Sequence, residues 1–149
     1  MLVCMLPWLS VNAKHASEAP VQLRLSGPKS VSAGSPLPLH LRFKNISRNQ
    51  SVVLNRASRY AYLSWSIHGK DGKSATYRGI EIDDCTAPPE VVNAGSQSEW
   101  IVDASQDYEF PGPGLYFFTA TYTFHDSGTL GDLKTPRSVS SNTIIITLR

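Results

Sequence analysis

The chain has 149 residues and a formal net charge of +2. This length suits a single domain with one hydrophobic core, and so small a charge excludes the strongly basic surface typical of nucleic-acid-binding proteins. Ten glycines and ten prolines, with many Ser, Thr and Asn residues, favour short strands and turns over long helices.

The first residues are unlike the rest of the chain. Leu2 to Val11 form an apolar run, and the small residue Ala13 follows at a position suited to signal-peptidase cleavage. No Lys or Arg precedes the run. The alternative is a buried first strand, which Pro7 disfavours. The run is too short to span a membrane. We therefore predict cleavage after Ala13 and a secreted or periplasmic protein.

The remainder divides into a short polar connector over residues 14–20 and one domain over residues 21–149. Apolar and polar residues alternate with period two over Val21–Ser26, most clearly over Leu37–Lys44, and again over Gly114–Phe124. Alternation of this kind predicts strands with one buried face. Further strands are expected at Val52–Leu54, Tyr60–His68, Ser74–Ile82, Gln97–Val102 and Asn142–Leu148.

Turn signals separate these segments. Asp71-Gly72 lies in a hairpin signal over residues 69–73, because this dipeptide adopts the positive φ angles of a tight turn. Tyr108 lies at a corner before the strand at 114–124, where a tyrosine can bond back to the backbone. About eight short strands without a helical period predict an all-β fold, an immunoglobulin-like antiparallel β-sandwich.

Four polar residues could share one outer face if the first two long strands pair. They are Arg24, His40, Arg42 and Lys44. The pattern predicts a small basic patch. Solvated strand faces commonly look like this, so the patch by itself does not indicate an anionic partner.

Catalytic motifs are lacking in the sequence. The histidines His15, His40, His68 and His125 form no H-E-x-x-H motif, and there is no G-x-S-x-G nucleophile motif. Adjacent residues such as His125, Asp126 and Ser127 do not normally adopt triad geometry. We therefore expect a protein that is not an enzyme and that uses no metal or other cofactor.

Cys85 would be the one cysteine of the mature chain, because Cys4 lies in the leader. The neighbouring Asp83 and Asp84 disfavour its thiolate form. Two interpretations stay open: a semi-buried apolar residue, or a free thiol that pairs with another molecule. If the leader is retained, a Cys4–Cys85 disulfide is a third.

The longest expected loop runs from His125 to Ser141. Long loops in compact domains often carry function, although a disordered connector would have the same composition. The candidate binding residues in this loop are His125, Asp126, Leu130, Asp132, Lys134 and Arg137.

A series of short motifs follows in a fixed order along the chain. They are Leu25-Ser26-Gly27-Pro28-Lys29-Ser30-Val31-Ser32-Ala33-Gly34, Lys44-Asn45, Tyr77-Arg78-Gly79-Ile80, Ala94-Gly95-Ser96, Tyr108-Glu109-Phe110 and Gly114-Leu115-Tyr116. Their order resembles the non-catalytic N-terminal β-sandwich of deuterolysin-like (aspzincin, peptidyl-Lys) metalloendopeptidases, over Val21 to about Phe124. The zinc-binding helix of that family's catalytic half is absent, so the resemblance implies a scaffold and no catalytic residue.

Together these features predict an exported binding module without enzymatic activity. The resemblance implies a peptidase as the protein that it contacts or inhibits. The alternative is a structural or assembly protein of the cell envelope that acts through edge-strand pairing. In either case the expected partner is another protein, not a nucleic acid, and the mature chain is expected to lack a membrane span.

Overall fold

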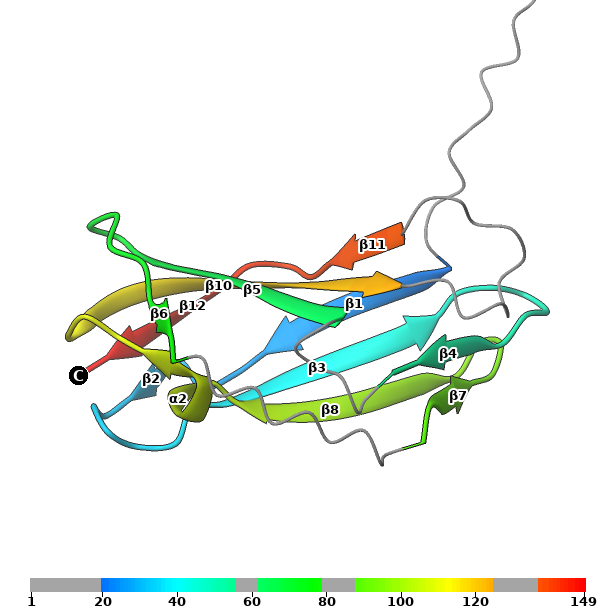
Figure 1. Ribbon diagram of the computed structural model, residues 1–149, viewed down its shortest axis with the longest axis horizontal. Helices are drawn as coiled ribbons and strands as arrows, with labels where there is room; N and C mark the ends of the chain where they lie inside the picture. The colour runs from blue at the N-terminus through cyan, green and yellow to red at the C-terminus, as the bar shows by residue number, and fades with distance from the viewer. Residues whose placement is uncertain (1–19, 56–61, 79–87, 125–136) are drawn as a thin grey trace, which may run out of the picture.

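The structure is a computed structural model that describes residues 20–55, 62–78, 88–124 and 137–149. The predicted leader and most of the predicted connector therefore lie outside the described residues. Two β-layers pack face to face around one core (Figure 1), and the fold is an immunoglobulin-like β-sandwich, as predicted. In Figure 1 the layer with β5, β10 and β11 lies above the layer with β3 and β8.

One layer, here called sheet A, has the strand order β1–β3–β8. β1 (Val21–Ser26), β3 (Pro38–Asn45) and β8 (Gln97–Asp103) are all antiparallel to their neighbours. In each strand buried and exposed residues alternate, since one face packs on the core and the other faces solvent. The strands predicted at these positions are confirmed.

The other layer, sheet B, is built around β10 (Gly114–Phe124). β5 (Leu63–Gly69) pairs with one edge of β10, and β12 (Ile144–Leu148) and β11 (Arg137–Ser140) pair in succession with the other. β2 (Ser30–Val31) joins the sheet parallel to β12.

The chain crosses from sheet A to sheet B between β1 and β2. Gly27 lies at this crossing, where a Cβ atom would come within 2.9 Å of Leu39 Cδ2 and 3.3 Å of Ile144 Cδ1. A residue without a side chain lets the backbone pass this close to the core. One edge segment therefore contributes to both layers.

Aromatic rings fill the centre of the core. Tyr122 makes edge-to-face contacts with Phe43, Trp100 and Phe124 at centroid distances of 5.3, 5.8 and 4.8 Å. Its hydroxyl accepts a hydrogen bond from the Asn55 backbone N–H at 2.8 Å. The ring is thus packed between the two layers while its polar end is satisfied.

Short elements close the ends of the sandwich. β4 (Val52–Leu54) pairs with β7 (Glu90–Val92), and β6 (Thr76–Tyr77) pairs with β9 (Tyr108–Glu109). The short helix α2 (Ala104–Asp107) follows β8. None of the described residues forms a helix long and apolar enough to cross a membrane.

Several of these elements depart from the predictions. β2, β7, β9 and α2 were not expected, because two to four residues are too few to show a period. Of the strand predicted over Ser74–Ile82, the described part forms β6 and a bridge between Ser74 and His68. Residues 79–82 of that range lie outside the described residues.

Candidate functional site

One of the loop residues that the sequence singled out is described, and it lies in a strand. Arg137 is the first residue of β11, is half-buried and lies opposite Phe124. The prediction of a loop that continues to Ser141 was wrong, because residues 137–140 pair with residues 121–124 of β10. The other candidates lie outside the described residues, namely His125, Asp126, Leu130, Asp132, Lys134 and Cys85.

Within the described part of the chain, no three His, Cys, Asp or Glu side chains are grouped so that they could hold a metal ion. The carboxylate of Asp103 is hydrogen-bonded to neighbouring residues of the fold. It accepts hydrogen bonds from the backbone N–H groups of Leu37 at 2.8 Å and Ser105 at 3.0 Å, and from the Ser105 hydroxyl at 2.6 Å. This carboxylate holds the start of α2 against the segment that precedes β3.

An open groove of about 850 Å³ runs along β1. All six residues of β1 line this groove, which we call the β1 groove. Its other walls come from β3, β8, β11 and the residues just after β11. They are His40, Arg42, Glu99, Val139, Ser140 and Asn142.

One wall of the β1 groove is the exposed face of sheet A. Arg24 lies opposite Arg42, which in turn lies opposite Glu99. Glu99 Oε1 accepts a hydrogen bond from Arg42 Nε at 2.8 Å and forms an ion pair with Arg42 Nη2 at 2.7 Å. Two arginines therefore face each other across β1 and β3, and the one described acid of this row is bonded to Arg42.

The neighbouring row carries a further positive charge. Lys44 lies between Gln22 and Gln97, and no described acid forms an ion pair with Lys44 or with Arg24. His40 is exposed on the same face, opposite Ser26. The predicted grouping of Arg24, His40, Arg42 and Lys44 on one outer face is confirmed.

The backbone edge of β1 forms the second feature of the groove. Asn142 Nδ2 donates to the Leu25 carbonyl at 3.0 Å, and Asn142 Oδ1 accepts from the Leu25 N–H at 2.9 Å. On the opposite side Pro20 accepts from the Ile46 N–H, so the even-numbered residues of this segment bond to the segment containing β3. By alternation, the N–H and C=O groups of Val21 and Leu23 point to the same edge as those of Leu25.

No described strand pairs with that edge of β1. Buried backbone groups in proteins are almost always hydrogen-bonded, and an exposed row of them can pair with another chain. The edge at Val21 and Leu23 therefore offers two donors and two acceptors to an incoming strand.

A second cavity, of about 360 Å³, lies where β2, α2 and β9 meet at one end of the sandwich. Its walls include Val31, Leu37, Phe110 and Leu148, with the exposed Arg78 also contributing. Among the described residues, no buried side-chain nitrogen or oxygen lacks a hydrogen bond. The walls of this cavity thus present no unsatisfied buried polar side chain for a ligand.

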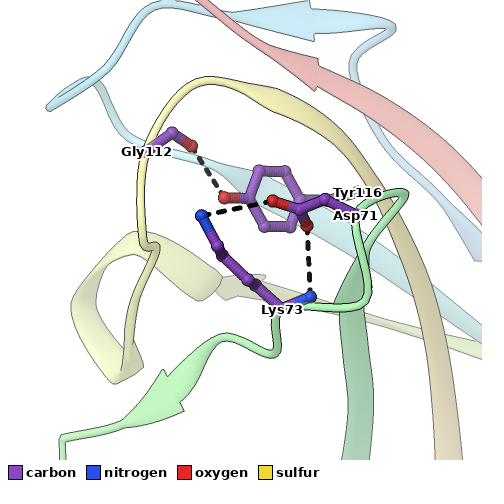
Figure 2. A network of polar contacts seen from close by, with 4 residues as sticks. All are labelled: Asp71, Lys73, Gly112 and Tyr116. Atoms are coloured by element: carbon purple, nitrogen blue, oxygen red, sulfur yellow. Dashed lines mark hydrogen bonds and ion pairs between the residues drawn. The ribbon is translucent and has the colours of Figure 1, made fainter.

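Polar contacts close to this cavity brace the turn before β10, as Figure 2 shows. The Tyr116 hydroxyl donates to the Gly112 carbonyl at 2.7 Å. Burial raises the pKa of Tyr116, and the nearby Asp71 carboxylate raises it further. Asp71 accepts from the Lys73 N–H at 3.1 Å and lies 3.5 Å from Lys73 Nζ. Tyr116 is thus bonded to Gly112, and Asp71 to Lys73. We assign both pairs a structural role.

Outside β1, the sequence did not indicate four residues that line the β1 groove: Glu99, Val139, Ser140 and Asn142. Glu99 lies in a predicted strand, and its ion pair with Arg42 depends on the register of β3 and β8. Asn142 contacts Leu25 across 117 positions. The sequence predicted Asn142 as the first residue of its last strand, and no local signal pointed to a contact with Leu25.

The fold places the chain in the class of immunoglobulin-like β-sandwiches. No family model and no curated protein matches the chain. A similar solved structure is the alkylpurine DNA glycosylase AlkC of Pseudomonas fluorescens bound to DNA containing an abasic site analog. Its TM-score is 0.44 and its identity 11%, with 88% of this chain and 31% of that chain covered. This chain thus spans about a third of the glycosylase chain.

Two further structures are similar. The CARDB domain of a Pyrococcus furiosus protein, in complex with di-metal ions, has a TM-score of 0.40 and 13% identity, with 87% of both chains covered. The thioester domain of the Enterococcus faecium TIE86 protein has a TM-score of 0.25 and 14% identity, with 90% of this chain and 46% of that chain covered. At such low similarity these structures carry no information on function.

Proposed function

We propose that this protein is a non-enzymatic binding module that takes up an extended segment of another protein along β1. The observation that carries this proposal is the backbone edge at Val21 and Leu23, which no described strand covers and which faces an open groove. Addition of a strand to such an edge is a common mode of peptide recognition, since main-chain hydrogen bonds supply affinity.

The bond pattern at Leu25 supports the geometry of this binding mode. The Asn142 side-chain amide occupies the place of a neighbouring peptide group and pairs with both backbone groups of Leu25. An incoming strand would continue the same pattern at Leu23 and Val21. Its inward side chains would lie near Val139, a half-buried apolar residue of the opposite wall.

Two sources of the segment are proposed. The resemblance to a non-catalytic metalloendopeptidase domain favours a peptidase, which the module would contact or inhibit. The alternative source is a component of the cell envelope, which the module would join in an assembly. Both fit a protein exported through the predicted leader. Mass spectrometry of the protein from its native host should then show Lys14 as the N-terminal residue.

Amide hydrogen exchange tests the proposed edge directly. The probes are three peptides of equal length with blocked ends, in which valine alternates with threonine, glutamate or lysine. Binding of at least one peptide should slow exchange of the Val21 and Leu23 amides. The Gln22 and Arg24 amides, which point towards β3, serve as internal controls. Unchanged exchange at Val21 and Leu23 with all three peptides would contradict strand addition at β1.

A purified metalloendopeptidase from the same host tests the peptidase as the source. The mature protein should bind this enzyme and protect the same two amides. If the two proteins neither bind nor affect each other's activity, the peptidase version fails while edge binding itself can stand.

A further inference from the structure

Three cationic side chains, those of Arg24, Arg42 and Lys44, lie on the exposed face of sheet A next to β1. Arg24 and Arg42 are directly opposite each other, and like charges in such cross-strand pairs are destabilising. Glu99 relieves the repulsion at Arg42, to which it bonds at 2.7 Å, while Arg24 and Lys44 form no ion pair with a described residue. The arrangement leaves a site for negative charge beside the edge of β1 with which no described strand pairs.

We infer that the segment taken up by β1 carries acidic side chains at alternate positions, facing the same side as Arg24 and Lys44. This inference rests on the proposed function. In a strand added antiparallel to β1, the residues opposite Leu23 would exchange backbone bonds with it. The residues opposite Gln22 and Arg24 would then form the non-bonded pairs, whose side chains approach most closely.

The alternation also determines which residues of the module the other side chains of the added strand would contact. Residues next in sequence to each acid would point inward, where the buried side chains of Val21, Leu23 and Leu25 and the half-buried Val139 line the groove. Apolar residues suit those positions, because successive side chains of a strand point to opposite faces. The expected partner is therefore an extended segment in which acidic and apolar residues alternate.

A second copy of this chain is a poor occupant of the same edge. If two β1 strands paired, the Arg24 side chains of both copies would share one sheet face with both copies of Arg42 and Lys44. That face would combine several like charges, and among the described residues an acid forms an ion pair with Arg42 but with neither Arg24 nor Lys44. Charge therefore favours a different, acidic partner over self-association.

The three alternating peptides test this inference separately from edge binding. The glutamate peptide should bind about fivefold more tightly than the threonine peptide, since exposed ion pairs each add modestly to affinity. The lysine peptide should bind most weakly. Added salt should reduce the preference for glutamate, because exposed charges are screened.

Charge reversal at Arg24 gives the decisive comparison. In Arg24→Glu the order of the peptides should invert, so that the lysine peptide binds more tightly than the glutamate peptide. Lys44→Glu should likewise weaken binding of the glutamate peptide. Lys70→Glu is the matched control, because Lys70 is exposed on the turn after β5, outside the β1 groove, and its reversal should leave the order unchanged.

The outcomes distinguish the two proposals. Equal protection of Val21 and Leu23 by all three peptides, with no effect of Arg24→Glu, would overturn the acidic partner and leave strand addition standing. Protection that appears in concentrated protein without peptide would identify a second copy as the occupant and overturn the acidic partner. No protection under any condition would overturn both.

Discussion

The side-chain amide of Asn142 makes with Leu25 the two hydrogen bonds that a peptide group of a neighbouring strand would make. A single residue after β11 thus completes the edge of β1 at Leu25, whereas no described strand pairs with this edge at Leu23 and Val21. The structure defines where an added strand would have to stop, because Leu25 is already bonded.

Replacing Asn142 tests this relationship. Asn142→Ala should speed amide exchange at Leu25 and lower the free energy of unfolding by about 1 kcal/mol, because two hydrogen bonds are lost at an open groove. Asn142→Asp keeps an acceptor for the Leu25 N–H, but its second carboxylate oxygen would face the Leu25 carbonyl without a hydrogen to donate, so it should not restore the stability lost in Asn142→Ala. Exchange measurements and urea unfolding would check both. Unchanged Leu25 exchange in Asn142→Ala would contradict the assignment.

The carboxylate of Asp103 should make the fold sensitive to acid. Burial raises the pKa of Asp103, but hydrogen bonds from Ser105, Leu37 and Gln106 outweigh it and hold the pKa below the ordinary value of 3.8. Because the folded-state pKa is lowered, this stabilisation is present above the ordinary value. It is lost as the pH falls through the lowered one.

Asp103→Ala should therefore lower the free energy of unfolding at neutral pH by about 1–2 kcal/mol, the usual cost of losing a helix N-cap. The difference from the wild type should shrink in acid. Glu109→Gln, at an exposed position, is the control and should change stability little. Urea unfolding across the acid range checks the prediction, and a difference that stays constant with pH would refute the ionic part of it.

The buried hydroxyl of Tyr122 should make the folded protein lose stability at alkaline pH. Burial raises the pKa of Tyr122 to about 12, against an ordinary value of 10.0. A raised pKa gives stability that is complete below the ordinary value and is lost as the pH rises through the folded-state value. Tyr122→Phe should lack this part of the alkaline loss. At neutral pH it should be less stable by about 1 kcal/mol, because the Asn55 N–H loses its acceptor. Unfolding curves for both proteins at neutral and alkaline pH provide the comparison.

Gly27 should not tolerate a side chain. A methyl group there would lie 2.9 Å from Leu39 Cδ2, so Gly27→Val should lower the free energy of unfolding by about 1–3 kcal/mol through overpacking. Gly27→Ala should have a smaller effect of the same sign. Ser26→Ala, at the exposed neighbouring position, should change stability by less than about 0.5 kcal/mol. Thermal unfolding of the three variants would rank them.

The long strands could be predicted because each buries one face over several residues. β1, β3 and β10 show the alternation that the sequence indicated. β2 and β7 are too short to show it. β11 reads Arg-Ser-Val-Ser, in which Val139 is the one apolar residue. Its pairing with β10 is supported instead by the hydroxyl pairs of Thr121 with Ser140 and of Thr123 with Ser138.

The short helix had a local signal that hydrophobic periodicity does not detect. Asp103 caps α2, and Gln106 occupies the third helical position, which is the spacing of a capping box. The β1 groove could be predicted from the sequence only in part. Alternation was enough to group Arg24 with Arg42 once the two strands pair. The contact between Leu25 and Asn142 depends on how the two layers meet and has no local signal.

The parallel pairing of β2 with β12 has a mechanical consequence. Three backbone bonds link the two segments: Thr147 to Lys29, Arg149 to Val31, and Ala33 to Arg149. Tension applied before β2 and after β12 would pull these parallel segments along their length in opposite directions. The three hydrogen bonds would then be loaded in shear at the same time, and they would not break one after another. We expect the pairing of β2 with β12 to resist this tension more strongly than the two residues of β2 would suggest.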